Sequence, residues 1–332
     1  DSFSSRKPAV REDAYDQRGG APPISSDPPK HRPARMALLP PFTPQNIDKL
    51  EPKARKVCNE LIDAIVVKAK TNGGRFDGAV DYAQHIPVRL IAHLLGVPES
   101  DGDMFRRWIS EILQLGTTNR EIRVRANGEM KEYFAVRVAE RRAKPGDDLI
   151  SYLTQQRYPD GEPFRDNHVI GSCGLLLVAG IDTTWSGIGA SIWHLAKTPA
   201  DRERLVAEPE LIPTAIEEFL RAYAPVTMAR EIAQDAIVAG CPMKRGEMVM
   251  LSFPAANRDP AVFADADKVI IDRKENRHAA FGLGIHRCIG SNLARLEMRE
   301  RDVLLEERRP AAAGRVSHLR AADVHGSARG SG

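Results

Sequence analysis

The 332-residue chain contains few cysteines, few aromatic residues and no long apolar segment. Its four cysteines are widely spaced and form no Cys-x-x-Cys pair, which argues against a zinc cluster and against a disulfide framework. The longest apolar stretch, 174–181, is far shorter than the roughly 20 residues that a membrane-spanning helix needs. Aromatic residues make up only 6% of the chain, but hydrophobic residues make up 42%, so aliphatic side chains can form a sizeable core.

The chain has no large excess of positive or negative charge. The formal net charge is +3, and lysines and arginines are spread along the chain without a dense run. This distribution argues against nucleic-acid binding. Because no signal peptide is recognisable either, we expect a cytoplasmic protein that binds neither nucleic acid nor membrane.

Apolar residues recur at helical spacing along most of the chain. The spacing predicts helices over residues 47–71, 80–95, 103–115, 120–142, 166–197, 199–205, 212–223 and 291–300. Strands are predicted only at 231–238 and 248–252. There is no internal repeat and no Gly/Ser-rich linker before the C-terminal tail, so we expect one mainly α-helical domain with a minor β-sheet.

The segment 281–290, Phe-Gly-Leu-Gly-Ile-His-Arg-Cys-Ile-Gly, carries the most chemical information. It places Cys288 in a glycine-rich loop just before a predicted helix. Free backbone N–H groups and the helix dipole stabilise a thiolate at such a position. The glycines allow the backbone to approach a flat ligand closely. The pattern is that of a single cysteine holding a haem iron; the alternative is a buried cysteine in a tight turn.

Five segments resemble motifs of the cytochrome P450 family, and their order along the chain is the family's order. The cysteine loop resembles its proximal haem loop, and Glu218 to Arg221 matches its Glu-x-x-Arg signature. Residues 27–35 resemble the bacterial Asp-Pro-Pro-x-His-x-x-x-Arg segment, 179–184 resemble the oxygen-activation motif, and 257–260 read Asn-Arg-Asp-Pro. The similarity extends from about Phe3 to Glu300 and implies the family's helical fold.

The resemblance implies a haem b cofactor (iron protoporphyrin IX) with Cys288 as its axial iron ligand. His286 is then a hydrogen-bond donor to a haem propionate, although its position two residues before the cysteine also allows a second metal ligand. The full set of cofactor-binding residues implied in this way is His31, Arg35, Ala179, Gly180, Arg230, Phe281, Gly282, His286, Cys288 and Gly290.

Two residues in the long predicted helix are implied to be catalytic. By resemblance, Asp182 relays protons toward bound dioxygen and Thr183 holds that dioxygen together with ordered water. A threonine hydroxyl that bonds back to a helix carbonyl would loosen the helix beside the iron. The glycines in this helix have close helix packing as an alternative explanation.

Glu218 and Arg221 stand three residues apart and allow either a surface ion pair or, as the resemblance implies, a buried network that holds the haem loop.

The activity that the resemblance implies is insertion of one oxygen atom from O2 into a small organic substrate. Electrons would come from a ferredoxin or flavodoxin-type partner docking on Arg32, Arg287, Arg295 and Arg299. The alternatives are a peroxide-using haem-thiolate enzyme and an inactive or merely haem-binding fragment.

Both ends of the sequence differ from the family pattern. The Asp-Pro-Pro segment follows only 26 residues, and the last residues are rich in Ala, Arg, Gly and Ser. We therefore expect a haem domain over 1–308 that is incomplete at its N-terminus, followed by an atypical, disordered tail over 309–332. Our hypothesis for this pattern is an N-terminal truncation combined with a C-terminal frameshift or vector-derived scar.

Overall fold

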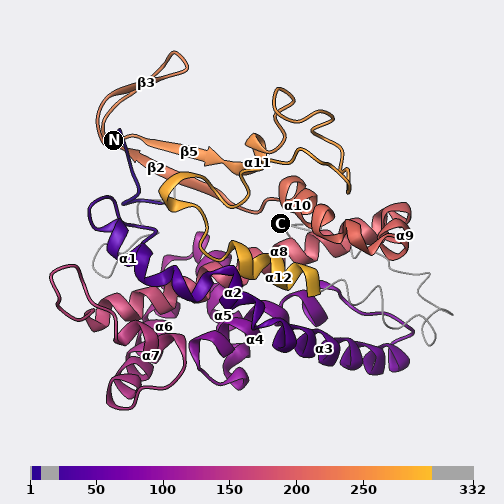
Figure 1. The fold of residues 1–332 in the computed structure, drawn as a ribbon, viewed down its shortest axis with the longest axis horizontal. Helices are drawn as coiled ribbons and strands as arrows, with labels where there is room; N and C mark the ends of the chain where they lie inside the picture. Colours follow the sequence, from indigo (N-terminus) through magenta and orange to yellow (C-terminus); the bar gives the residue numbers. More distant parts are fainter. Residues whose placement is uncertain (1, 9–21, 301–332) are drawn as a thin grey trace, which may run out of the picture.

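The computed structural model describes residues 2–8 and 22–300, and its ribbon is mainly helical (Figure 1). The helices are α1 (His31–Leu38), α2 (Pro44–Asp48), α3 (Glu51–Thr71), α4 (His85–Leu95), α5 (Gly102–Leu113), α6 (Arg120–Ala143), α7 (Leu149–Thr154), α8 (Asp166–Lys197), α9 (Pro199–Ala207), α10 (Ile212–Ala222), α11 (Phe253–Ala256) and α12 (Ser291–Glu300). The strands are β1 (Phe3–Ser4), β2 (Thr227–Ile232), β3 (Ala236–Val238), β4 (Cys241–Met243) and β5 (Met248–Ser252). The predicted tail 309–332 lies outside the described residues.

The long helices follow the predicted apolar spacing closely, and the prediction for α8 is confirmed at both ends. The predicted helix 47–71 is interrupted where α2 ends and α3 begins, next to Pro52 in the first turn of α3. Residues 79–83 form a π-helical turn before α4. The short helices α1 and α7 were not predicted, because six to eight residues give too little periodicity to recognise.

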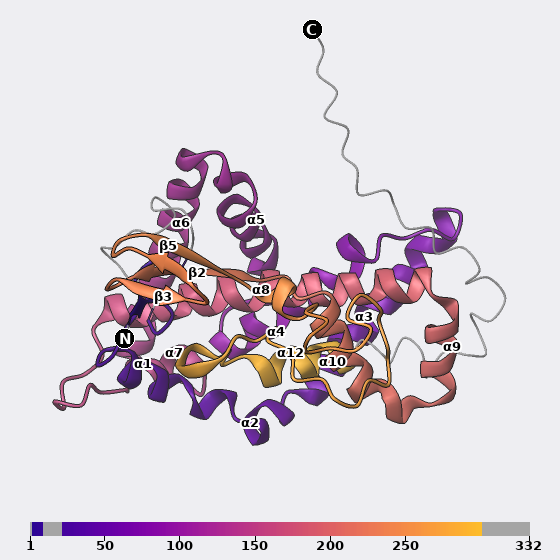
Figure 2. The ribbon, with the colours of Figure 1, turned by 90° about the horizontal axis from the view of Figure 1, so that it is seen from above.

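Helix α8 forms the axis of the fold. It packs against α4, α6, α9 and α12, and Figure 2 shows it running lengthwise through the molecule with other helices on its sides. Some of its glycines allow close packing of a neighbouring side chain. A Cβ on Gly174, for example, would lie 3.2 Å from Met130 Cε. Among the described helices, α8 is also the one long and apolar enough to cross a membrane, and 56% of that apolar window is buried inside the protein.

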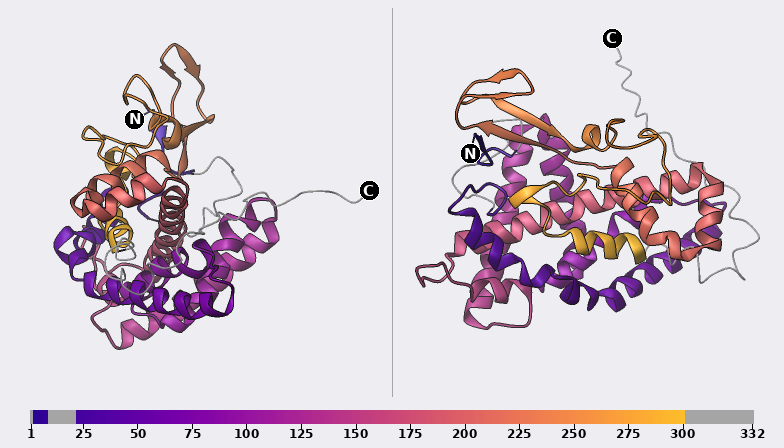
Figure 3. Two further views of the ribbon diagram at one scale, coloured as in Figure 1. Left: turned by 90° about the vertical axis from the view of Figure 1, so that its right-hand side faces the viewer. Right: turned by 45° about the horizontal axis from the view of Figure 1, so that its top comes forward.

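The predicted strand over 231–238 is wrong. Strand β2 ends at Ile232, and β3 begins only at Ala236. Between them Asp235 accepts a hydrogen bond from the Arg245 N–H at 2.9 Å, which starts a separate β3–β4 hairpin. The hairpin turn needs a positive φ at both Ala239 and Gly240. Figure 3 shows this hairpin projecting from the helical body.

The main sheet has the strand order β1-β2-β5 and is antiparallel throughout. The predicted bounds of β5 are confirmed. Strand β2 pairs with β5 from Thr227 opposite Ser252 to Glu231 opposite Met248. This pairing fixes Arg230 in the middle of the sheet.

The Glu-x-x-Arg pair of α10 lies in the core, which confirms a buried network. Glu218 and Arg221 are fully buried and joined by two hydrogen bonds of 2.8 Å. Arg221 also donates to the carbonyls of Asn257, Ala266 and Lys268, and Glu218 accepts from Arg273 Nε at 3.0 Å. The network therefore ties α10 to the long irregular segment that leads to Cys288.

Candidate active site

The backbone of the cysteine loop is held by short hydrogen bonds. The Cys288 N–H donates to the Phe281 carbonyl at 2.7 Å, and the Gly282 N–H donates to the Ala279 carbonyl at 2.8 Å. Gly282 and Gly284 have φ of 65° and 68°, which disfavour any side chain. The next helix, α12, begins at Ser291. Cys288 therefore lies just before a helix N-terminus, as predicted.

The thiol of Cys288 is exposed on one side. The protein packed around the rest of the sulfur raises its pKa, while the Gly290 N–H and the charges of Arg35, Arg287 and Arg295 act in the opposite direction. Backbone N–H groups and cations stabilise a thiolate. The surroundings thus supply the features that favour an anionic sulfur ligand.

Four predicted cofactor-binding residues form one cationic cluster: His31, Arg35, Arg230 and His286. The ring centroids of His31 and His286 are 4.4 Å apart. Burial, followed by the charges of His31 and Arg230, lowers the pKa of His286 to about 4. Within residues 2–8 and 22–300, neither Arg35 nor Arg230 forms an ion pair with a carboxylate.

This cationic cluster contains a buried polar atom without a partner. His31 is 5% exposed, and its Nε2 makes no hydrogen bond within the described part of the chain. A pocket of about 400 Å³ opens beside it, lined by Pro28, Pro29, His31, Arg32, Arg35 and Ile285. Unpaired cations, an unpartnered nitrogen and an accessible thiol suit a flat ligand with two carboxylates, so the residues fit haem.

The predicted catalytic residues lie on a different element, α8. Thr183 Oγ1 donates a hydrogen bond to the Ala179 carbonyl at 2.8 Å, which confirms that this hydroxyl bonds back to its own helix. The helix remains regular there. Burial raises the pKa of Asp182, and a hydrogen bond with Trp185 partly offsets it. Gly180 packs next to Ile91, whose Cδ1 would be 3.7 Å from an added Cβ, an ordinary contact.

Sequence reasoning missed several residues that hold the site. Arg273 and Asn276 both donate to Glu218, and no short motif marks them. Asp27 accepts hydrogen bonds from Ser4 Oγ and Ser5 N, which joins the Asp-Pro-Pro segment to β1. Glu217, one residue before the recognised glutamate, binds Arg295. These partners come from distant parts of the chain, so only the fold reveals them.

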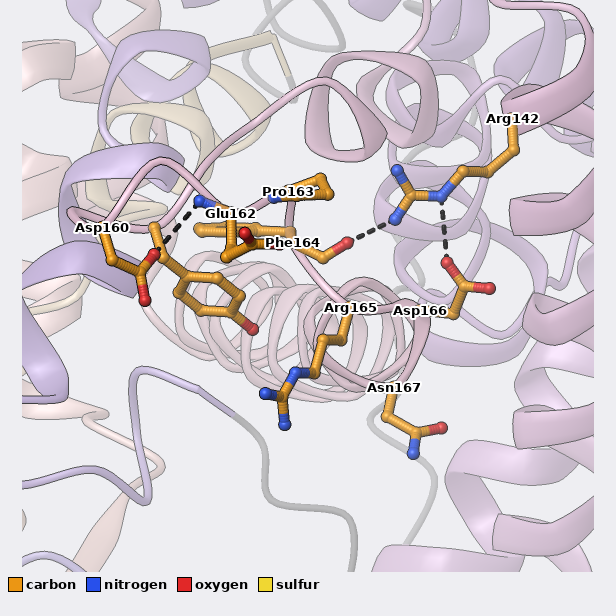
Figure 4. Close-up of a pocket in the computed structure, with 9 residues that line it drawn as sticks. Arg142, Asp160, Glu162, Pro163, Phe164, Arg165, Asp166 and Asn167 are labelled. Atoms are coloured by element: carbon orange, nitrogen blue, oxygen red, sulfur yellow. Dashed lines mark hydrogen bonds and ion pairs between the residues drawn. The ribbon is translucent and has the colours of Figure 1, made fainter.

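A larger pocket, of about 510 Å³, lies at the N-terminus of α8 (Figure 4). Its lining combines both charge signs, and Arg142 is already bound to Asp166 at 2.9 Å and to the Phe164 carbonyl. The lining residues are Arg142, Tyr158, Asp160, Glu162, Pro163, Phe164, Arg165, Asp166 and Asn167. None of them is a predicted site residue.

Known proteins resemble this chain in both sequence and fold. The chain is 35% identical to a mycinamicin IV hydroxylase/epoxidase of Micromonospora griseorubida, over 86% of this chain and 72% of that protein. The structure of the bacillaene polyketide synthase P450 PksS of Bacillus subtilis matches with a TM-score of 0.81 at 32% identity, covering 90% of this chain and 76% of that one. CYP109E1 from Bacillus megaterium in complex with testosterone matches with a TM-score of 0.78 at 36% identity, covering 91% and 78%.

These likenesses confirm the predicted mainly helical fold with a small sheet. Relatives with hydroxylase activity include a vitamin D(3) 25-hydroxylase of Pseudonocardia autotrophica, 36% identical over 83% of this chain and 67% of that protein. The cytochrome P450 family model matches residues 102–300, a range that includes the α8 motif, the Glu218–Arg221 pair and the cysteine loop. This chain therefore belongs to the bacterial cytochrome P450 monooxygenase family, whose cofactor is a haem bound through a cysteine thiolate.

Proposed function

We propose that this protein is a haem-thiolate monooxygenase that inserts one oxygen atom from O2 into a small organic substrate, with Cys288 as the axial ligand. The observation that carries the proposal is the accessible Cys288 thiol next to the cationic cluster. Among the described residues, no carboxylate forms an ion pair with Arg35 or Arg230 of that cluster. When bound, a thiolate-ligated haem supplies oxygen activation, because electron donation by the sulfur favours O–O cleavage.

The chain's own residues would hold this cofactor from two sides. Arg35, Arg230 and His286 would bind the two propionates, and the unpartnered Nε2 of His31 would contribute a further hydrogen bond. Phe281 and Gly282 shape the loop under the sulfur, while Gly290 directs its N–H toward it. Ala179, which is exposed, and Gly180 present a surface of α8 without bulky side chains.

On the α8 side of the site, Asp182 would relay protons and Thr183 would position a water molecule. The raised pKa of Asp182 allows this carboxyl to hold a proton at a higher pH than an exposed aspartate. The Thr183 hydroxyl already donates to Ala179, so its oxygen is free to accept a hydrogen bond from water. A peroxide-using enzyme would not need this pair, which favours O2 as the oxidant.

The substrate class we propose is a bulky, largely apolar ring compound. Structures similar to this chain contain mycinamicin IV, erythromycin B, testosterone or corticosterone, at 32–36% identity. A panel of macrolides and steroids should be titrated into the haem-loaded protein. A saturable spin-state shift with at least one of them is expected, and a response only to much smaller molecules would contradict this class.

We further propose that a ferredoxin or flavodoxin-type protein supplies the electrons to this enzyme in the cytoplasm. Arg287, next to Cys288 in the chain, and Arg32, which lines the pocket beside His31, are exposed and suit an acidic partner. Arg295 and Arg299 are less suitable than the sequence suggested, because they form ion pairs with Glu217 and Glu51. Reduction by a ferredoxin should slow with rising salt and in Arg287→Gln; a rate independent of both would refute this surface.

The decisive experiment is reconstitution of the 332-residue chain with haem, followed by reduction under CO. The parent protein should give the red-shifted spectrum typical of thiolate ligation, and Cys288→Ser should lose it, since a neutral hydroxyl is a far weaker ligand. Cys241→Ser is the matched control, because Cys241 is also exposed but lies on the β3–β4 hairpin. No haem retention by the parent would favour the alternative of an inactive fragment.

A further inference from the structure

Helix α10 carries two neighbouring carboxylates that face different parts of the molecule. Glu218 accepts hydrogen bonds inside the buried network described above. Glu217 instead binds the Arg295 guanidinium of α12 through both oxygens, from Nε at 2.6 Å and from Nη2 at 2.8 Å. His278 Nε2 contacts the same carboxylate at 3.1 Å. Glu217 therefore connects α10 with α12 and with the residues just before the cysteine loop.

The Arg295 guanidinium, held in this way, lies over the ring of Phe281. The guanidinium carbon is 4.6 Å from the ring centroid, the geometry of a cation–π contact. Phe281 in turn accepts the backbone hydrogen bond of Cys288 at 2.7 Å. A fixed positive charge thus lies one aromatic ring away from the loop that holds the sulfur, and it favours the anionic form of that sulfur.

The two charges are held in a half-buried environment. The side chains of Arg295 and Glu217 are 31% and 30% exposed, and His278 is almost fully buried. Burial alone would raise the pKa of Glu217, but the bonds from Arg295 and His278 lower it to about 2. Because the pair is half-buried, solvent and salt screen it less than a pair on the open surface.

We propose that Glu217 and Arg295 are positioning residues that set the electrostatic environment of the Cys288 sulfur through Phe281. This inference rests on the proposed role of Cys288 as the iron ligand. A nearby positive charge favours the reduced iron, and a nearby negative charge favours the oxidised iron. The ion pair keeps these two influences in balance, while the stacked guanidinium fixes the ring against the loop.

The test is the midpoint potential of the haem-loaded 332-residue chain. Arg295→Gln leaves the Glu217 charge unbalanced and should lower the potential, whereas Glu217→Gln leaves Arg295 unbalanced and should raise it. The double variant removes both charges and should return toward the parent value. A merely structural role would weaken folding in both single variants but would not shift the potential in opposite directions.

Two further variants complete the experiment. Arg204→Gln removes an arginine from a surface ion pair with Asp272 on a different part of the molecule, and should leave the potential unchanged. Arg295→Lys keeps the charge without the bidentate fork, and should stay closer to the parent than Arg295→Gln. Shifts of the same sign in both single variants, or shifts no larger than that of Arg204→Gln, would overturn the inference.

The failure of this inference is distinguishable from failure of the proposed function. If the parent lacks the thiolate-type CO spectrum, Cys288 is not the ligand and the proposed function is wrong. If the parent shows that spectrum and the charge variants do not differ in potential, only the role of the ion pair is wrong. If Arg295→Gln does not retain haem, Glu217→Gln should still raise the potential, while Arg295→Lys, which keeps the charge, should stay close to the parent value.

Discussion

At the residue scale, the Thr183 hydroxyl makes a structural bond that is compatible with its proposed catalytic role. Its Oγ1 donates to the Ala179 carbonyl at 2.8 Å, so the side-chain rotamer is fixed and the oxygen lone pairs point away from that bond. A fixed acceptor would hold a water molecule in a defined place beside the proposed cofactor. This geometry explains why a threonine is useful there despite its modest helix propensity.

Thr183→Ala should leave haem retention and substrate-induced spin shifts nearly unchanged, because no described residue except Ala179 depends on this hydroxyl. The loss of the ordered acceptor should lower the amount of product formed per NAD(P)H consumed, by roughly 10-fold or more if proton delivery is lost. Thr183→Ser, which keeps the hydroxyl, is the control. Equal coupling in the alanine variant and the parent would remove Thr183 from the proton path.

Glu297 carries a carboxyl group that is buried in the core. It is 1% exposed, its Oε2 has no partner in the part of the chain that the structure describes, and burial raises its pKa well above the ordinary value. Because the folded-state pKa is the higher one, protonation favours the folded state. The associated stability is present below the unfolded-state pKa of about 4.3 and is lost as the pH rises toward the folded-state pKa.

Glu297→Gln should therefore increase stability at pH 7, since an amide cannot ionise. The gain should shrink toward zero as the pH falls well below the unfolded-state pKa of about 4.3, where the parent carboxyl is protonated in both states. Urea unfolding of parent and variant at several pH values measures this difference. A variant that is less stable than the parent at every pH would show that the carboxylate has a partner that the amide cannot replace.

At the scale of elements, helix α10 holds in place the chain segments before and after the cysteine loop. It holds the irregular segment 257–276 through Glu218 and Arg221, and it holds α12 through Glu217. Asn257 adds a further link, because its Oδ1 accepts the Ala279 N–H at 2.6 Å. A segment with little regular structure is thereby fixed by side chains rather than by backbone ladders.

Arg273→Gln tests this arrangement. Arg273 donates to Glu218 and to the Ala264 carbonyl, and its loss leaves part of a buried carboxylate uncompensated. The expected loss of stability is roughly 3–5 kcal/mol, as for breaking other buried pairs. Lys274→Gln changes the exposed neighbour and should cost less than about 0.5 kcal/mol. Similar denaturation midpoints for both variants would show that Arg273 is dispensable.

At the scale of the whole molecule, the proposed cofactor site is a destabilising feature of the folded chain without ligand. The positive charges of Arg35 and Arg230 both act on His286, without an ion-paired carboxylate among the described residues, and repel each other. The β3–β4 hairpin and β5 also expose apolar side chains, such as Ile237 at 76% and Met250 at 61%. A ligand that binds only the native state should relieve the repulsion and stabilise the fold by mass action.

We therefore expect a weakly stable, aggregation-prone protein in the absence of haem, and a clear rise of the melting temperature with haem. At a haem concentration 100 times the Kd the gain is about 2.7 kcal/mol, or roughly 2–4 °C for each kcal/mol. Metal-free protoporphyrin retains the propionates but not the iron, so it should give only part of this shift. A cooperative melt of the haem-free protein at roughly 45–65 °C would contradict the expected weakness.

The sequence by itself determined the class of fold, the long helices and the position of the chemistry. Helical periodicity is a local property, so α3, α6 and α8 could be read from their own residues. The Cys288 loop and the Glu218–Arg221 pair are contiguous motifs, and their order along the chain indicated the family before any contact was known.

Only the tertiary structure decided which residues act together. Arg273 binds Glu218 from 55 residues away, and Arg295 binds Glu217 from 78 residues away, so no local pattern marks either pair. The strand predicted over 231–238 was wrong for the same reason: the carboxylate of Asp235 bonds to Arg245 across a hairpin and ends the strand. Apolar spacing is set within one element, whereas the partner of a charge is set by the packing of several elements.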